Sequence, residues 1–421
     1  MFKKLKKLLS VLGPGFITGA SDDDPSGIAT YAQTGAQFGY QQLWTAPFSF
    51  PFMTVIQEMC GRIGLVTGRG LAGVIKKHYS RPILYIAVLV LFIANTVNIG
   101  ANLGAMADVA GLLFGIPFIF WLIGMTVLTL ALEVFVSYKV YSKYLKYLAF
   151  SLFAYVLAAF VVRQNWEQII TSTIVPTFSL SDGFLLNIVA ILGTTISPYL
   201  FFWQETEEVE EEVERGKIMG IGRGIPKVSR RDIREMRMDT VVGMFFSNLV
   251  MFFIIATVAS TLYASGIHNI NTADQAAEAL IPLAGNFAYL LFAAGIIGTG
   301  LLSVPILAGS ASYALAEALG WREGLYRKFR QAHGFYGAIT IATLVGLLVN
   351  FLHIPPFKML YYTAVLNGIA APPLLIIILL VSNNKKIMGG RTNSLLSNTL
   401  GTLIAVIMSL AALALLFNLL F

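Results

Sequence analysis

Three consecutive aspartates, Asp22, Asp23 and Asp24, lie in the stretch GPGFITGASDDDPSGIAT (residues 13–30), which otherwise consists mostly of small and apolar residues. Carboxylate oxygens are hard ligands of the kind that Mg²⁺ and Ca²⁺ prefer. At the centre of a bilayer an ionised carboxylate costs about 2.5–3.5 kcal/mol, and adjacent carboxylates repel one another. Because no Lys or Arg follows Lys7 in this segment, the cost must be offset by protonation, a water-filled cavity, a cation from another helix or a bound metal ion.

The composition places this segment in a membrane. Of 421 residues, 57% are hydrophobic and 12% are charged, and the mean hydropathy is +0.74. Apolar stretches of about 20 residues, long enough to cross a bilayer as helices, recur along the chain. We predict eleven spans, near residues 12–38, 42–66, 83–112, 116–136, 145–163, 184–205, 239–263, 284–312, 335–353, 359–382 and 397–420.

Basic residues alternate between the loops, as expected when cytoplasmic loops hold the Lys and Arg excess. The basic groups are Lys3–Lys7, Arg69–Arg81, Lys139–Lys146, Arg215–Arg237, Arg322–Arg330 and Lys385–Arg391. This pattern predicts a multi-pass protein of a prokaryotic cell membrane, with the N-terminus in the cytoplasm and the C-terminus outside. The net charge of +7 is then a topology signal, with attraction to anionic lipid as a secondary effect, and not a sign of nucleic-acid binding.

Two of the spans carry helix-breaking residues. Pro25 removes a backbone donor and disfavours helical geometry at Asp24, and the stretch GTTISPYLFFWQ interrupts the sixth span near Pro198. Broken helices at matching positions of two halves indicate an inverted-repeat transporter that binds its substrate between them. The alternative, that these residues only kink helices for packing, remains open.

Asp24, directly before Pro25, is the best candidate for a metal ligand. The unwound carbonyl of Ala20 would add an oxygen at the end of the inner half-helix. For Asp22 and Asp23 two interpretations stay open: they take part in the metal site with Asp24, or they only cap the outer half-helix or face a vestibule.

Several motifs resemble those of the NRAMP divalent-metal transporters. GPGF (13–16), DPSG (24–27) and GAQFGY (35–40) match the family's first helix, and GLVTGRGLA (64–72), LLFGIP (112–117) and RMDT (237–240) match later segments. The resemblance implies a LeuT-type fold with five-plus-five inverted repeats, broken helices 1 and 6, and a metal site between them.

The residues that define metal chemistry in that family are altered here. In the family's motif D-P-G-N, the position of the asparagine is taken here by Gly27. The family's motif A-T-V-M-P-H aligns with residues 194–199, so Ser197 replaces the methionine and Tyr199 replaces the histidine. Losing the thioether removes selectivity for soft metals, and Gly27 is expected to enlarge the site for a partly hydrated ion. Thr194 completes the expected ligand set.

The family's proton relay is also expected to be lost. Its acidic residues in the third helix align with Ile99 and Asn102, and its histidines in the sixth helix with Tyr199 and Gln204. The chain in this respect resembles the NRAMP-related magnesium transporters, a branch that moves hydrated Mg²⁺ without proton coupling.

The remaining polar residues allow two interpretations each. The acidic stretch 205–214 is either a solvated helix end paired with Arg215, Lys217, Arg230 and Arg231, or an inner mouth lined by Glu205, Glu207 and Glu208. Asn367 either faces the cavity or, as we favour, holds helices together. Asn95, Asn98 and Asn102 share a helix face that suits interhelical hydrogen bonds.

Other chemistry finds little support. Cys60 is the single cysteine, and His78, His268, His333 and His353 lie outside both breaks. TGRG (67–70) lacks a phosphate-loop lysine, which argues against an ATP-driven pump, and we see no enzyme signature, no cofactor site and no sign of an obligate protein partner.

The sequence thus predicts an all-α membrane protein with one domain over residues 1–421. It contains repeat one (about 10–163), repeat two (about 184–382) and an additional helix (about 397–420). The expected function is import of Mg²⁺, with Mn²⁺ as a second candidate, by alternating access without protons. A same-fold transporter of an organic solute and a non-transporting sensor are the alternatives.

Overall fold

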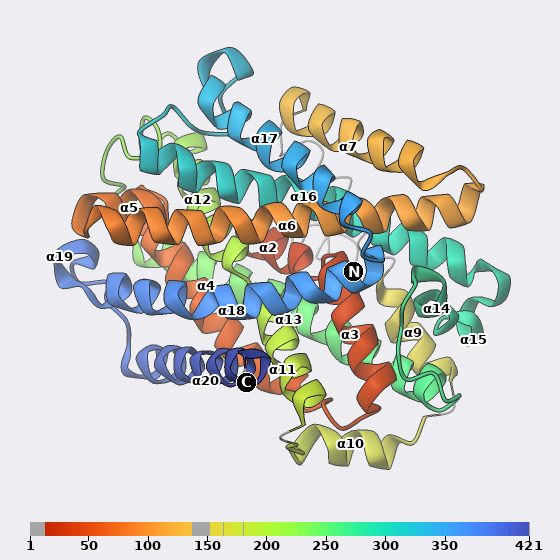
Figure 1. Ribbon diagram of the computed structural model, residues 1–421. Coiled ribbons are helices and arrows are strands. Elements are labelled where there is room, and N and C mark those ends of the chain that lie inside the picture. The colour runs from red at the N-terminus through yellow and green to blue at the C-terminus, as the bar shows by residue number, and fades with distance from the viewer. Residues whose placement is uncertain (1–12, 137–151, 163, 180, 421) are drawn as a thin grey trace, which may run out of the picture.

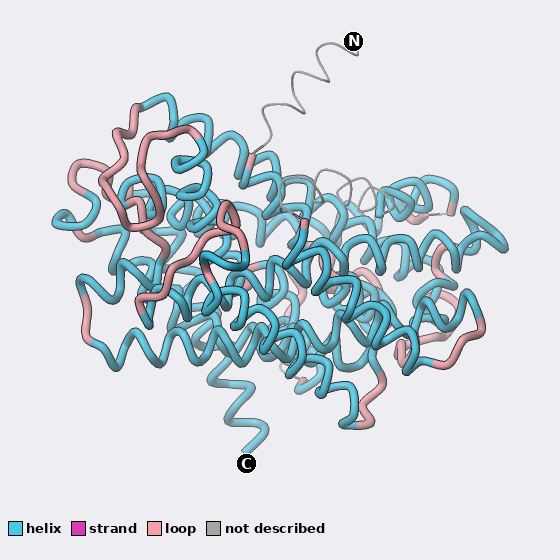
Figure 2. Tube along the Cα trace, turned by 90° about the horizontal axis from the view of Figure 1, so that it is seen from above, coloured by secondary structure: helices cyan, strands magenta, loops and turns pink. Residues whose placement is uncertain are grey.

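The computed structural model describes residues 13–136, 152–162, 164–179 and 181–420, and in this part of the chain the regular structure is helical (Figures 1 and 2). The first half contains α2 (Pro14–Asp22), α3 (Pro25–Phe38), α4 (Thr45–Thr67), α5 (Leu71–His78), α6 (Arg81–Phe114), α7 (Phe118–Phe135), α9 (Phe153–Val161) and α10 (Trp166–Ile174). The second half contains α11 (Asp182–Thr195), α12 (Pro198–Glu214), α13 (Arg230–Val258), α14 (Ala273–Glu278), α15 (Ile281–Ala284), α16 (Ala288–Leu319), α17 (His333–Val349), α18 (Pro356–Asn383), α19 (Lys385–Met388) and α20 (Leu395–Leu420).

Eight helical stretches of the described residues are long and apolar enough to cross a bilayer, which makes this a multi-pass membrane protein. They coincide with the predicted third, fourth and sixth to eleventh spans. The predicted second span is α4, and the first is divided between α2 and α3. The predicted fifth span is described only from residue 152 onward, as α9, and Lys139–Lys146 lie outside the described residues.

Both predicted helix breaks are confirmed. The first separates α2 from α3 at Asp23 and Asp24, and the second separates α11 from α12 at Ile196 and Ser197. In each case a proline is the first residue of the helix that follows the break. At that position the missing N–H and the fixed φ of proline are tolerated. The kink interpretation holds elsewhere, because α4, α16 and α18 continue through internal prolines.

Glycine contacts hold the broken helices against their neighbours. A Cβ at Gly15 of α2 would lie 2.6 Å from the backbone nitrogen of Thr240 in α13, and Gly19 meets Gly243 backbone to backbone. Gly193 of α11 meets Gly368 of α18 in the same way. Such close approach of small residues is typical of helix packing in membranes, and it leaves no room for a larger side chain at these positions.

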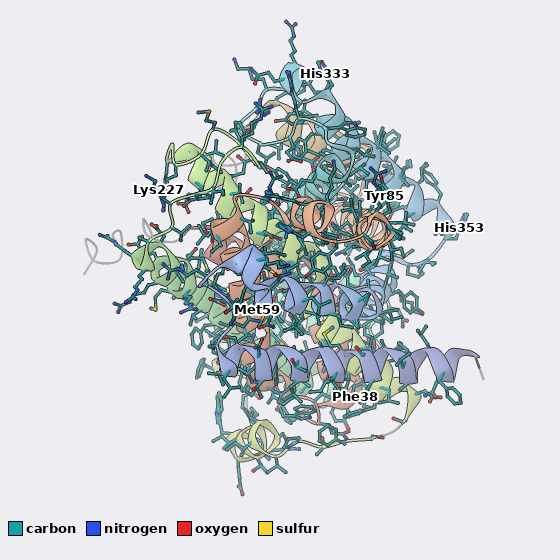
Figure 3. All side chains as sticks on the ribbon, turned by 90° about the vertical axis from the view of Figure 1, so that its left-hand side faces the viewer. Phe38, Met59, Tyr85, Lys227, His333 and His353 are labelled. Atoms are coloured by element: carbon teal, nitrogen blue, oxygen red, sulfur yellow. The ribbon has the colours of Figure 1, made fainter. Side chains whose placement is uncertain are left out.

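The loops that carry the described basic residues gather at one end of the bundle. Figure 1 shows α5 and α19 at this end, on the left, and α14 and α15 at the opposite end. Figure 3 looks onto the first end, with Lys227 and His333 near its periphery. This arrangement agrees with the predicted charge alternation, although the N-terminal lysines Lys3–Lys7 lie outside the described residues.

Candidate metal site between the two helix breaks

Asp24 lies in the first break and caps the outer half-helix α3. Its Oδ1 accepts hydrogen bonds from the hydroxyl of Ser26 at 2.6 Å and the amide of Gly27 at 2.8 Å. Its Oδ2 accepts from Nδ2 of Asn102 at 3.1 Å and of Asn98 at 3.3 Å, both in α6. The side chain is 1% exposed and, among the described residues, contacts no basic group within ion-pair distance. It therefore faces the protein interior as a carboxylate held by four neutral donors.

Asp22 and Asp23 face α13. The hydroxyl of Ser247 lies 2.6 Å from Oδ2 of Asp22 and 3.3 Å from Oδ1 of Asp23, and Oδ1 of Asp22 is buried without a partner. The capping interpretation is therefore wrong for Asp22 and Asp23, because Asp24 is the N-cap of α3, and both side chains are at most 4% exposed in this conformation. Sequence spacing alone cannot tell which of three adjacent carboxylates caps a helix.

The two breaks contact each other at Gly27 and Thr194. A Cβ at Gly27 would lie 3.1 Å from the carbonyl oxygen of Asp22 and 3.2 Å from Oγ1 of Thr194. The expectation that glycine leaves open room here is wrong for this conformation, since neighbouring oxygens already fill it. Ser197, the N-cap of α12, donates its hydroxyl to the carbonyls of Gly193 and Thr194, and so satisfies oxygens that the break in the sixth span leaves free.

Tyr199 closes the inner side of the first break. Its hydroxyl donates to the carbonyl of Ser21 at 2.8 Å, and its own carbonyl accepts from Ser310 at 2.9 Å. Ala20, whose carbonyl is the predicted ligand, lies in the last turn of α2, one residue away. Tyr199 is buried rather than exposed in a vestibule, and it joins α12 to the end of α2 where a titratable histidine was expected in the family.

The third-helix asparagines form the part of the site that sequence analysis did not assign to it. Asn102 bonds to Asp24 and to Ser303 of α16, Asn98 accepts from Thr363 of α18, and Asn95 donates to the carbonyl of Leu307. The predicted interhelical bonding is confirmed, but two of these side chains also orient Asp24. Ile99, the other aligned relay position, is fully buried among apolar side chains.

Asn367 is 1% exposed, and neither atom of its amide has a hydrogen-bond partner. The expectation that it holds helices together by hydrogen bonding is therefore wrong here. It lies one turn after Thr363 on α18, so both side chains lie on the same helix face. Because Thr363 bonds Asn98, which bonds Asp24, this face is directed toward the first break.

The acidic segment is mostly buried, so the solvated-helix-end interpretation is wrong. The fully or nearly buried carboxylates are Glu205, Glu208, Glu210 and Glu212. Of the expected pairs, Arg215 bonds Glu211 at 2.7 Å and Lys217 bonds Glu212 at 2.9 Å, while Arg231 pairs with Glu235 instead. Gln204 is also buried, and it donates to Glu208 at 2.9 Å.

Two cavities approach the breaks from opposite ends, and we name them inner and outer after the topology predicted from the charges. The inner one, about 270 Å³, is lined by Gly13 and Pro14 at the start of α2 and by Glu208, Glu211 and Asp239 among others, whereas Glu205 and Glu207 do not line it. The outer one, about 380 Å³, is lined by Gln33 and Gln37 of α3, by Asn269 and Asn271, and by Tyr361 of α18. Asp22, Asp23 and Asp24 line neither of these two cavities, and their side chains are at most 4% exposed, so the aspartates are closed off from solvent in this conformation.

Among the described residues, no three carboxylate, imidazole or thiolate groups converge as a metal site. The four histidines lie outside both breaks, as predicted, and Cys60 is buried and unpaired. Helices α2, α3 and α11, and α12 as far as Gln204, contain no Met, His or Cys. The ligands available to a cation at the breaks are therefore carboxylate, hydroxyl, amide and backbone oxygens. Such ligands suit a hard ion that keeps part of its water.

Comparisons with known proteins agree with this architecture. A family model described as natural resistance-associated macrophage protein-like (Nramp) matches residues 15–418. The divalent metal cation transporter MntH of Erwinia tasmaniensis is 25% identical over 423 residues, which cover 96% of this chain and 93% of that protein. MntH of Mesorhizobium japonicum is 28% identical over 314 residues, covering 71% of this chain and 65% of that protein, slightly less than two thirds of its length.

Two solved structures share the fold. The manganese transporter of Eremococcus coleocola, in complex with an aromatic bis-isothiourea compound, superposes with a TM-score of 0.78 at 17% identity and covers 97% of this chain and 86% of its own. Mhp1, a nucleobase-cation-symport-1 family transporter, gives 0.54 at 14% identity in a closed conformation, with 97% and 92% covered. The predicted LeuT-type architecture with broken first and sixth helices is thereby confirmed.

Proposed function

The chain belongs to the Nramp family, and on that premise we propose that it imports Mg²⁺, with Mn²⁺ as a second substrate, by alternating access and without proton coupling. The end that carries α5 and α19 faces the cytoplasm in this proposal, which puts the N-terminus inside and the C-terminus outside. Relatives named as divalent metal cation transporters support the ion class. The choice of Mg²⁺ depends on the site itself.

The observation that carries the proposal is the environment of Asp24. It is a buried carboxylate in a helix break, its partners are hydroxyl and amide groups, and the broken helices supply no sulfur or imidazole. Soft thioether ligands favour transition metals, whereas Mg²⁺ takes one or two carboxylates and keeps several waters. Asp24 is the main anionic ligand in this scheme, with the carbonyl of Ala20 and the oxygens of Thr194 and Ser197 near the bound ion.

A hydrated ion also needs acceptors for its water. Oδ1 of Asn102 and the amide of Asn367 are buried and unpartnered. The first belongs to the same side chain that bonds Asp24, and the second lies on the α18 face directed toward it. We assign them to the water shell of the ion, which explains polar atoms that are otherwise costly to bury.

The positions of the two cavities support alternating access. Asp24 is buried between an outer cavity beside α3 and an inner cavity beside the start of α2. Movement of α2 and α12 away from α13 would connect the site with the inner cavity, and movement of α3 and α11 away from α18 would connect it with the outer one. The closed structure lies between these two states.

The residues at the relay positions support the proposed independence from protons. Ile99 and Asn102 do not titrate, and the Tyr199 hydroxyl is engaged by the Ser21 carbonyl. An interior-negative potential supplies about 2.3 kcal/mol per charge per 100 mV. A divalent ion therefore accumulates without a coupled proton.

Uptake into proteoliposomes tests the mechanism directly. With a Mg²⁺ indicator and a pH indicator both inside, we expect an inward Mg²⁺ gradient to raise internal Mg²⁺ while internal pH follows that of protein-free liposomes. The rate should rise when the interior is made negative with a potassium gradient and valinomycin. Internal acidification in proportion to metal entry would disprove the uncoupled mechanism.

Thermal unfolding separates this function from the two alternatives. Only a ligand that binds the folded state raises the transition temperature, and at a hundredfold excess over Kd it adds about 2.7 kcal/mol. We expect Mg²⁺ and Mn²⁺ to raise the transition of the purified protein and an organic amine such as choline to leave it unchanged. A choline response without a metal response would favour an organic-solute transporter, whereas a metal response without uptake would favour a sensor.

A further inference from the structure

A third cavity, lined by polar residues, lies at the end of the bundle that carries α5, away from both helix breaks. It has a volume of about 570 Å³, within the range of small-molecule sites, and is walled by α5, by residues 221–223 and by the loop between α16 and α17. Its basic residues are Arg69, Lys76, Lys77, Arg223, Arg322 and Arg327. We call this space the basic cavity.

The charge of the basic cavity is not balanced from within the described protein. None of its six cations forms an ion pair with a described residue, and the bonds that they make go to carbonyl oxygens. Arg69 donates to Gly222, Lys76 to Glu317 and Arg327 to Glu323. Six cations line this space against two carboxylates, Glu317 and Glu323, and the repulsion among the cations favours a bound anion.

The two carboxylates in the wall are too few to neutralise it. Both oxygens of Glu317 accept from the backbone amides of Gly70 and Gly73, at 2.7 and 2.8 Å, so this side chain caps α5 and offsets at most one of the six positive charges. Burial and the neighbouring Glu317 and Glu210 carboxylates raise the pKa of Glu323 to about 10, so Glu323 is neutral at pH 7. The cavity therefore keeps an excess of positive charge.

We propose that the basic cavity binds a soluble polyphosphate anion. A chain of phosphates matches both the number of cations and the geometry of guanidinium groups, which bind phosphate oxygens in pairs. The ligand would join α5 to the segment that follows α12. This segment is already bonded to the turn between α4 and α5, because the Gly222 amide donates to the carbonyl of Gly68, the C-cap of α4, at 2.7 Å. Binding would thus stabilise the position that α12, the second half of the sixth span, has in this closed conformation.

Binding of tripolyphosphate to purified full-length protein tests the proposal, with inorganic phosphate as the weaker comparison ligand. Lys77, Arg223 and Arg322 are exposed, and their side chains form no hydrogen bond or ion pair with another described residue, so we expect the triple variant Lys77→Ala, Arg223→Ala, Arg322→Ala to keep the fold. We expect calorimetric affinity for tripolyphosphate to fall at least about tenfold in this variant, because it removes three cations that can form charge-assisted hydrogen bonds to phosphate oxygens.

A matched control removes three cations from the same end of the molecule but outside the cavity: Lys227→Ala, Arg330→Ala, Lys386→Ala, of which Lys227 is labelled in Figure 3. It should keep wild-type affinity. Equal losses in both variants, or no binding to the wild type at low salt, would overturn the proposal. A parallel titration in nanodiscs separates the two sources of phosphate, a soluble ligand and a lipid headgroup. Binding of tripolyphosphate to protein in phosphatidylcholine discs supports a soluble ligand. If protein in detergent binds tripolyphosphate but protein in phosphatidylglycerol discs does not, the site belongs to lipid and the proposal is overturned. None of these measurements requires transport, so their failure would leave the proposed function untouched.

Discussion

Changing Asp24 to Asn is expected to abolish Mg²⁺ uptake while leaving the fold intact. Asparagine still caps α3, because its side-chain oxygen can accept from Gly27, but it removes the negative charge that offsets the bound cation. Losing one partner of a buried charge pair costs about 3–5 kcal/mol, equivalent to at least roughly a hundredfold in affinity. Initial uptake rates in proteoliposomes should therefore fall to those of protein-free liposomes.

The control for this change is Asp182→Asn, the same substitution at an exposed position at the start of α11. It should keep most of the wild-type rate. The Mg²⁺-dependent rise in transition temperature should also disappear in Asp24→Asn and persist in Asp182→Asn. Uptake by Asp24→Asn at the wild-type rate would remove Asp24 from the metal site and with it the central assignment.

The backbone features of this site were predictable because they depend on local chemistry. Proline directly after Asp24 and after Ser197 lacks the amide that a helix needs, so both breaks follow from residue type and neighbours alone. Span length and charge alternation likewise need no tertiary information. The third-helix asparagines could be placed on one face by their spacing, and that face does bond to other helices.

The contacts across the bundle were not predictable in the same way. Asn102 meets Asp24 across 78 residues of sequence, and the α2 amides meet Asp239 across more than 220. Such pairings depend on how helices are rotated and shifted against each other, which one sequence does not encode in any local pattern. The burial of Glu205 and its neighbours was missed for the same reason, since acidic residues at helical spacing usually indicate a solvated surface.

Asp239 fixes the inner half-helix in the closed position. Its two carboxylate oxygens accept from the amides of Gly13 at 2.9 Å and Gly15 at 2.7 Å, at the start of α2. These amides belong to the first turn of a helix, where they have no partner within the helix and where negative charge is favoured. The contact lies beside the inner cavity, so in the proposed import mechanism it would close the side through which the ion leaves.

Changing Asp239 to Ala is therefore expected to open the protein toward the inner cavity. Hydrogen bonds to a charged group contribute about 1.5–3 kcal/mol each, so the variant should lose roughly 3 kcal/mol of stability and populate the inward-open state. In a Cys60→Ser background with Thr18→Cys, a thiol reagent that cannot cross the membrane, applied from the inner side, should label α2 at least about tenfold faster than in the parent. Labelling reports the open state independently of transport.

Glu235→Ala is the matched control, because Glu235 lines the same cavity but bonds only to Arg231 on its own helix among the described residues. An exposed pair of this kind contributes little to stability, and the labelling rate should stay at the parent value. Asp239→Asn, which keeps one acceptor oxygen but no charge, should be intermediate. If Asp239→Ala and Glu235→Ala accelerate labelling equally, the effect comes from loss of charge in the cavity, and Asp239 does not hold α2 closed.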